Sequence, residues 1–166
     1  CPSYPLYPPH PCYDVCAMKV GIVSDSHGKA DRLRRALEEL IRRGAEKVVH
    51  CGDVGSADCV DVLAGCGVEA YAVAGNMDRR PEELAQRARQ LGVHFSLDTI
   101  LVPIGEGDYL AATHGNDAAA LSQLIAAGRY RYVCHGHTHR RRDERLGDVH
   151  VINPGALHHT HSPTFA

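Results

Sequence analysis

The chain has 166 residues, of which 44% are hydrophobic, so it is long enough to bury a core and its composition excludes a disordered protein. Its formal net charge of −2 argues against a dedicated nucleic-acid binder, which usually carries a strongly basic surface. No apolar stretch approaches the length of a membrane span, and the seven cysteines include no C-x-x-C pair, which indicates reduced, buried thiols rather than a disulfide framework.

The first 17 residues differ from the rest of the chain because they contain five of its nine prolines. Proline has no backbone N–H and does not fit a helix interior, so residues 1–17 are predicted to form an irregular N-terminal extension. A strand pattern begins at Met18, which we expect to be the natural start of a single domain over 18–166. A proline-rich recognition tail is the alternative for 1–17. The chain start lacks the pattern of a signal peptide, so a cytoplasmic location is expected.

Strands and helices alternate in the first half of the domain. An apolar strand over 19–23 precedes a helix over 30–43, in which the apolar residues recur at the spacing of one buried helical face. The further elements expected here are a strand over 47–50, a helix over 56–64, a strand over 68–73 and a helix over 81–91. This βαβαβ order predicts an α/β protein whose sheet is covered by helices.

The second half is richer in strands and contains two predicted hairpins. The first pairs strands over 99–104 and 109–113, and the second pairs strands over 140–146 and 149–152. The elements expected between the hairpins are a helix over 117–127 and a strand over 132–135. We therefore expect sheet layers covered by helices in this half as well.

Residues of types that commonly bind metal ions, each close to a glycine, follow five of the predicted strands. The blocks are Asp25-Ser26-His27-Gly28, Gly52-Asp53, Gly75-Asn76-Met77-Asp78, His114-Gly115-Asn116 and Gly136-His137-Thr138-His139. Functional groups gather at the carboxyl ends of strands in open α/β sheets, and glycine lets the backbone turn sharply beside them. Any one block can be a turn, a helix cap or a structural histidine. Together they predict a metal site.

The ordered series D-x-H, G-D, G-N-x-D, H-G, G-H-T-H and N-P-G, the last at Asn153-Pro154-Gly155, resembles the signature of the calcineurin-like metallophosphoesterases. In its compact size the chain is similar to the small YfcE-type phosphodiesterase branch of that superfamily. The resemblance runs from Met18 to about Leu157. It implies an α/β fold in four layers, a sandwich of two mixed β-sheets flanked by helices.

The resemblance also implies a binuclear centre with two divalent transition-metal ions per chain. One ion would be held by Asp25, His27, Asp53 and His139. The other would be held by Asp53, Asn76, His114 and His137, so that Asp53 bridges the two. Imidazole and carboxylate donors suit transition metals better than Mg²⁺ or Ca²⁺; relatives point to Mn²⁺ or Ni²⁺, with Zn²⁺, Co²⁺ and Fe²⁺ as alternatives.

The implied activity is hydrolysis of a phosphodiester by a hydroxide that bridges the metals, with Asp53, Asn76 and His114 as catalytic residues. Two cations about 3.5–4 Å apart clamp the attacking and leaving oxygens of such a displacement. The alternatives are a phosphomonoesterase acting on a small metabolite or phosphoprotein, and a non-catalytic module similar to the retromer subunit Vps29. All seven ligand positions are retained, which favours an enzyme. The expected partners are a small phosphodiester and further copies of the chain in a dimer or tetramer, with no membrane or nucleic acid.

Three positions depart from the family pattern. Met77 stands where many larger relatives have a histidine that can protonate the leaving group, Asn116 replaces the second histidine of an H-G-H block, and Ala156 replaces a serine after N-P-G. Asp78 is a candidate for binding substrate, with a positioning or structural role as the alternative. We expect packing roles for His50 and His135, and no catalytic role for the tail histidines His158, His159 and His161.

Overall fold

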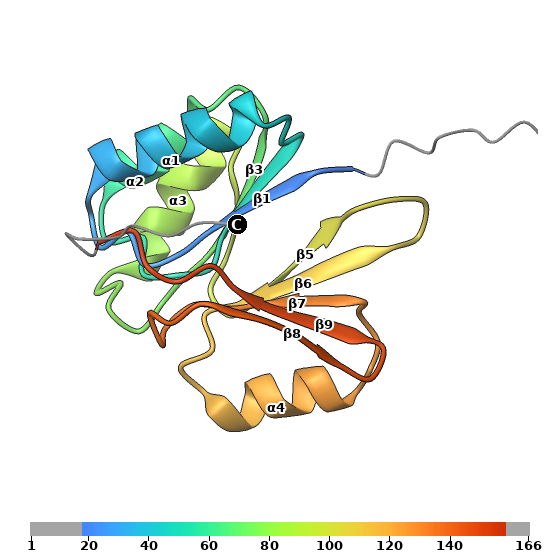
Figure 1. Cartoon of the computed structure of the whole chain (residues 1–166). Coiled ribbons are helices and arrows are strands. Elements are labelled where there is room, and N and C mark those ends of the chain that lie inside the picture. Colours follow the sequence, from blue (N-terminus) through green and yellow to red (C-terminus); the bar gives the residue numbers. More distant parts are fainter. Residues whose placement is uncertain (1–17, 159–166) are drawn as a thin grey trace, which may run out of the picture.

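The computed structural model describes residues 18–158, and the predicted extension over 1–17 lies outside them. Two β-sheets pack face to face, and helices cover the outer face of each (Figure 1). The predicted α/β sandwich flanked by helices is confirmed. No helix in the described part of the chain is long and apolar enough to cross a membrane.

The first sheet contains four strands in the order β1-β2-β3-β4. Its strands are β1 (Val20–Val23), β2 (Lys47–His50), β3 (Glu69–Val73) and β4 (His94–Ser96). The helices that connect them are α1 (Ala30–Arg42), α2 (Ala57–Ala64) and α3 (Pro81–Leu91). Because each connection crosses back through a helix, all pairs in this sheet are parallel. The expectation of two mixed sheets is therefore wrong for this sheet.

The strand β4 was not predicted from the sequence. It has three residues, of which one is exposed and two are partly buried, so neither its length nor its burial produces an alternating pattern. It forms because Tyr71, Ala72 and Val73 of β3 offer it a free edge.

The buried strands of the first sheet divide their side chains between two cores. Val48 packs with Leu33, Leu37 and other residues of the helices, whereas its neighbour Val49 packs with Val102 and other residues of the second sheet. A parallel sheet covered on both faces needs apolar residues on both, which explains the continuous apolar runs in its strands.

The second sheet contains five strands in the order β5-β6-β7-β9-β8. Its strands are β5 (Thr99–Pro103), β6 (Tyr109–Thr113), β7 (Tyr132–Cys134), β8 (Arg142–Leu146) and β9 (Val149–Asn153). Both predicted hairpins are confirmed as antiparallel pairs, and the pairs of β7 with β6 and β9 are parallel, so this sheet is mixed. The helix α4 (Ala118–Ala126) covers its outer face through Leu121, Leu124 and Ile125.

The loops at the carboxyl ends of the parallel strands lie against one another. The loop after β1 is bound to the loop after β2, because Asp25 N–H donates to the Gly52 carbonyl (3.0 Å) and His27 N–H to the Asp53 carbonyl (2.9 Å). In the second sheet, Gly136 N–H donates to the His114 carbonyl (3.0 Å). The fold thus places the sequence blocks that contain the predicted metal ligands at one end of the molecule.

Candidate metal centre

Glycines beside the predicted ligands allow the loops to approach more closely than a side chain would permit. A Cβ atom at Gly75 would overlap the carboxylate of Asp53, and a Cβ atom at Gly136 would overlap Ser24 Oγ. These two glycines are therefore required by the contacts between loops as well as by the turns that contain them.

The backbone is strained at the predicted ligands themselves. Within residues 18–158, the non-glycine residues with positive φ are Asp25 (54°), His27 (45°), Asp53 (55°), His137 (67°) and His139 (57°). Each such conformation costs on the order of 1–3 kcal/mol and persists only where the surrounding structure holds it. All five are predicted ligands, so the strained backbone conformations occur at the residues whose side chains must be oriented toward the metal site.

A first group of donor atoms forms around Asp25, which is fully buried. His139 Nε2 lies 3.1 Å and His27 Nε2 3.8 Å from Asp25 Oδ1, and the two ring nitrogens are 3.5 Å apart. Asp53 belongs to the same group, since its Oδ2 is 3.6 Å from His27 Nε2. Four of the predicted ligands are thus brought together.

A second group forms around His114, which is 1% exposed. Its Nε2 lies 3.0 Å from Asn76 Oδ1 and 3.4 Å from Asp53 Oδ2. The ring of His137 stands edge-on to that of His114, with 5.2 Å between their centroids. The same Oδ2 atom of Asp53 therefore faces both groups, while its Oδ1 accepts a hydrogen bond from Met77 N–H (2.8 Å).

The tautomer of His114 shows why this arrangement suits a cation. Its Nδ1 lies 2.9 Å from the Cys51 carbonyl, which accepts hydrogen bonds only, so Nδ1 carries the proton. In neutral His114 the lone pair of Nε2 then faces two oxygen acceptors, on Asn76 and Asp53. A metal ion bound to Nε2 would satisfy this lone pair and both oxygens.

The pKa shifts of Asp53 and His114 also indicate a site that suits a cation. Burial alone would raise the pKa of Asp53, but the hydrogen bonds from His114 and Met77 N–H outweigh it and lower that pKa. Burial likewise opposes protonation of His114, but the bonds to Asp53 and the Cys51 carbonyl outweigh it and raise the pKa of the imidazole. The site therefore stabilises an anionic carboxylate and a positive charge beside it, which a bound cation would supply.

The donor set fits a divalent metal. Asp25, His27 and Asp53 each offer one ligand atom, and these atoms lie within 4.8 Å of one another. Two carboxylates, one amide and four imidazoles form the whole predicted set, which suits first-row transition metals.

Asp78 does not direct its carboxylate at the donor groups. The side chain is buried, and its oxygens accept hydrogen bonds from the N–H groups of Val54 (3.2 Å), Gly55 (2.6 Å) and Gly75 (2.8 Å). These contacts tie the loop that carries Asp53 to the loop that begins at Gly75. They favour the positioning role of Asp78 over the predicted contact with substrate.

Asn153 of the N-P-G block has a role that was not predicted from the sequence. Its amide nitrogen donates to the Gly136 carbonyl (2.7 Å) and to Thr138 Oγ1 (3.1 Å), and its Oδ1 accepts from Gly155 N–H (2.9 Å). Asn153 therefore shapes the loop that carries His137 and His139. The place of Asn153 in an ordered motif was a sequence signal for such a role. Its partners Gly136 and Thr138 could not be identified from the sequence, because they follow a different strand, β7.

His158 was set aside as a tail residue, yet the structure places it at the first donor group. Its ring centroid lies 4.4 Å from that of His27 and 4.5 Å from that of His139. The sequence signal that could have found it is its position three residues after Gly155. The other tail histidines, His159 and His161, lie outside the described residues.

The packing roles expected for His50 and His135 agree with their burial. His50 is fully buried beside Ser26 Oγ (2.8 Å), and burial lowers its pKa to about 3. His135 is 3% exposed, and burial also lowers its pKa. Burial therefore favours the neutral form of both rings.

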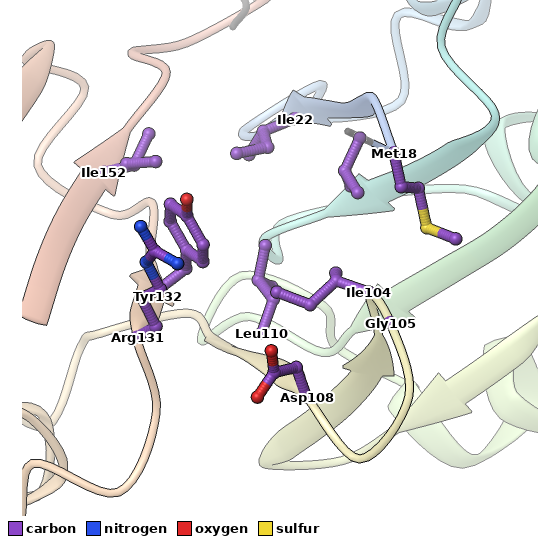
Figure 2. Close-up of a pocket in the computed structure, with 10 residues that line it drawn as sticks. Met18, Ile22, Ile104, Gly105, Asp108, Leu110, Arg131, Tyr132 and Ile152 are labelled. Atoms are coloured by element: carbon purple, nitrogen blue, oxygen red, sulfur yellow. The ribbon is translucent and has the colours of Figure 1, made fainter. Parts of the chain in front are cut away.

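A separate pocket of about 480 Å³ lies between the two sheets, near the beginnings of β1, β6 and β7. Figure 2 shows apolar side chains in its wall, among them Met18, which precedes β1, Ile22 of the first sheet and Leu110 of the second. None of the seven predicted metal ligands is among its lining residues. The pocket is therefore lined by residues other than the metal-binding candidates.

Carboxylates and imidazoles gathered at the strand ends of a two-sheet sandwich are the arrangement of a metal-dependent phosphate-ester hydrolase. The calcineurin-like phosphoesterase superfamily domain matches residues 18–166, and the chain belongs to that superfamily. Membership implies divalent metal ions as cofactors, and it confirms the predicted class of enzyme.

Relatives include phosphodiesterase MJ0936 of Methanocaldococcus jannaschii, which is 33% identical over 139 residues that cover 83% of each chain. Phosphodiesterase YfcE of Escherichia coli is 26% identical over 157 residues, covering 84% of this chain and 79% of its own. Among solved structures, an archaeal phosphodiesterase superposes with a TM-score of 0.80 at 32% identity, covering 89% of this chain and 91% of its own. Vps29 of Chaetomium thermophilum shares the fold, with a TM-score of 0.62 at 16% identity, covering 86% and 73%.

Proposed function

We propose that this protein hydrolyses a small phosphodiester with the help of two divalent transition-metal ions. The observation that carries the proposal is the position of Asp53 Oδ2, which lies 3.6 Å from His27 Nε2 and 3.4 Å from His114 Nε2. A carboxylate oxygen shared by two groups of donors can hold two ions close together, as a binuclear centre requires. The relatives named phosphodiesterases support the substrate class.

The seven predicted ligands divide between the two proposed ions at Asp53. One ion would be held by Asp25, His27, Asp53 and His139. The other would be held by Asp53, Asn76, His114 and His137. When bound, such ions lower the pKa of water and stabilise negative charge on the phosphoryl oxygens. We propose Mn²⁺ or Ni²⁺ first, with Zn²⁺, Co²⁺ and Fe²⁺ as alternatives that suit the same donors.

The burial of the ligands indicates the side from which substrate enters. Asp25, Asp53 and His114 are at most 2% exposed, whereas the side chains of His27 and His139 are 24% and 30% exposed. The three buried residues form the closed side of the centre, and His27 and His139, together with the exposed residues Asn76 and His137, border its open side. We keep Asp53, Asn76 and His114 as the proposed catalytic residues because Asn76 Oδ1 and Asp53 Oδ2 lie 3.0 and 3.4 Å from His114 Nε2.

Met77 limits the leaving groups that this site can release. Its side chain is 54% exposed and follows Asn76 directly, but a thioether has no proton to donate. A substrate whose leaving oxygen is already a weak base needs no protonation. We therefore expect activated diesters to be cleaved best.

The experiment that tests the proposal compares a chromogenic phosphodiester with the corresponding monoester. The metal-stripped 166-residue protein would be assayed after addition of Mn²⁺, Ni²⁺, Zn²⁺ or Mg²⁺. We expect turnover that depends on a transition metal and is faster for the diester. Faster cleavage of the monoester would favour the phosphomonoesterase alternative, and folded protein that turns over neither substrate would favour a binding module of the Vps29 kind.

The cytoplasmic location, the dimer or tetramer and the absence of a nucleic-acid partner remain predictions from the sequence. Size-exclusion chromatography with light scattering would test the oligomeric state directly.

A further inference from the structure

A histidine outside the family motif, His158, lies beside the two histidines of the first donor group, His27 and His139. The chain after β9 runs back along the loop after β1, where Leu157 N–H donates to the Ser24 carbonyl and His158 N–H to the Asp25 carbonyl, both at 3.1 Å. One ring nitrogen from each of His27, His139 and His158 lies within 4.8 Å of those of the other two.

The position of the His158 ring is held by its own backbone and by neighbouring groups. Arg32 Nη1 donates to the carbonyl oxygens of Leu157 (3.4 Å) and His158 (2.5 Å). The ring packs edge-on against His27 and His139, with interplanar angles of 78° and 70°. His158 is therefore placed at the group by several independent contacts.

A hydrogen bond to the backbone sets the tautomer of His158. Its Nδ1 lies 3.3 Å from the carbonyl oxygen of Asp25, which can only accept, so Nδ1 carries the proton and Nε2 keeps its lone pair. Metal-binding histidines commonly donate their second ring nitrogen to a backbone carbonyl or carboxylate in this way, which orients the ring and raises its basicity.

We propose that His158 is an additional imidazole ligand of the ion held by Asp25, His27, Asp53 and His139. The inference rests on the proposed metal centre and deepens it. His158 would raise the number of protein donors at that ion from four to five. A set of five protein donors would suit ions that accept more than four ligands better than Zn²⁺, which usually takes four.

The test measures metal binding directly, without reference to activity. Metal-stripped wild-type protein and a His158→Ala variant would be titrated with Co²⁺, following both the dissociation constants and the visible absorption of the bound ion. We expect His158→Ala to weaken one of two binding events by at least about tenfold and to change the Co²⁺ spectrum of that event. The other event should remain unchanged.

The matched control is the double variant His159→Ala/His161→Ala, which removes two imidazoles from the same tail. It should bind Co²⁺ as the wild type does, and an equal loss in this control would overturn the inference in favour of adventitious binding by the tail. Two binding events of unchanged affinity and spectrum in His158→Ala would refute the role of His158 while leaving the metal centre intact. No tight binding by the wild type would instead refute the proposed function. Equal melting temperatures of the metal-stripped proteins would show that the variants are folded.

Discussion

At the scale of single residues, the centre depends on side chains whose charges face one another. Asp53 is 2% exposed and keeps its negative charge because hydrogen bonds from His114 and Met77 N–H outweigh the effect of burial on its pKa. Its Oδ2 faces imidazoles of both donor groups. The Asp53 carboxylate therefore lies between His27 of one donor group and His114 of the other, and no other predicted ligand has this position.

The first prediction concerns Asp53→Asn. The amide keeps the shape of the side chain but removes the charge that would bridge the ions, and we expect kcat to fall at least about 100-fold, which corresponds to about 3 kcal/mol of lost transition-state stabilisation. Steady-state kinetics with the preferred metal measures the loss. Asp148→Asn in the exposed turn between β8 and β9 is the matched control and should be fully active. Wild-type activity in Asp53→Asn would contradict the assigned role.

The second prediction separates the two roles considered for Asp78. Asp78→Ala leaves the N–H groups of Val54, Gly55 and Gly75 without their acceptor, and an unsatisfied buried group costs about 1–3 kcal/mol. We expect a clear loss in the free energy of unfolding and a fall in kcat with little change in KM. Asp78→Asn retains one acceptor oxygen and should be milder. A rise in KM at unchanged stability would instead show contact with substrate.

At the scale of elements, the strands place the ligands at one end of the sheets, and the loops after the strands orient the ligand side chains. The loops after β1 and β2 are bound to each other by backbone hydrogen bonds and by Ser26 Oγ, which donates to the Val54 carbonyl (3.0 Å). The glycines that follow β3 and β7 make room for neighbouring loops. Local geometry at the strand ends is therefore as important to the centre as the ligands are.

The third prediction tests this role with Gly75→Ala. The new Cβ would overlap the Asp53 carboxylate, so the loop or the carboxylate must move and the affinity for metal should fall at least about tenfold. Calorimetric titration of metal-stripped protein measures it. Gly105→Ala is the control, because its Cβ would meet only Asp108 Cβ at 4.0 Å. Equal affinities of the two variants would argue against the need for glycine at this position.

At the scale of the whole molecule, the centre exists only when both sheets are assembled. His139 and Asp25 are 114 residues apart in the chain, and His114 and Cys51 are 63 apart. The donors are dispersed when the chain unfolds, so metal binding must be linked to global stability.

The fourth prediction follows from this linkage. A ligand at 100 times its dissociation constant stabilises the folded state by about 2.7 kcal/mol, which in a domain of this size raises Tm by roughly 5–10 °C per ion. Differential scanning calorimetry with and without Mn²⁺ or Ni²⁺ tests it, and Asp53→Asn should show a smaller rise. A Tm that does not respond to any transition metal would contradict the binuclear centre.

The fifth prediction concerns the N-terminal extension. No predicted ligand lies in residues 1–17, so a chain that begins at Met18 should retain its metal affinity, activity and Tm. Comparison with the full chain in the same assays checks this. A large drop in Tm would show that the extension takes part in folding.

The sequence by itself determined the order of the elements other than β4, and its ordered motif blocks contained the candidate ligands. The apolar spacing of α1 and the glycine-flanked blocks around Asp25 or His137 are local patterns, so they can be read from neighbouring residues alone. The parallel pairing throughout the first sheet and the strand β4 were settled by the tertiary structure, because strand pairing depends on partners that lie far along the chain.

Dependence on distant parts of the chain also explains why the ligands could be predicted from the sequence and the residues around them could not. Asp78 and Asn153 orient loops by hydrogen bonds to backbone groups of other segments, and His158 reaches His27 only because the last segment folds back over the first loop. A motif shows which side chains can bind a metal, since that property belongs to the side chain. Which groups lie beside them, and how the rings are oriented, depends on contacts between distant parts of the chain that exist only after folding.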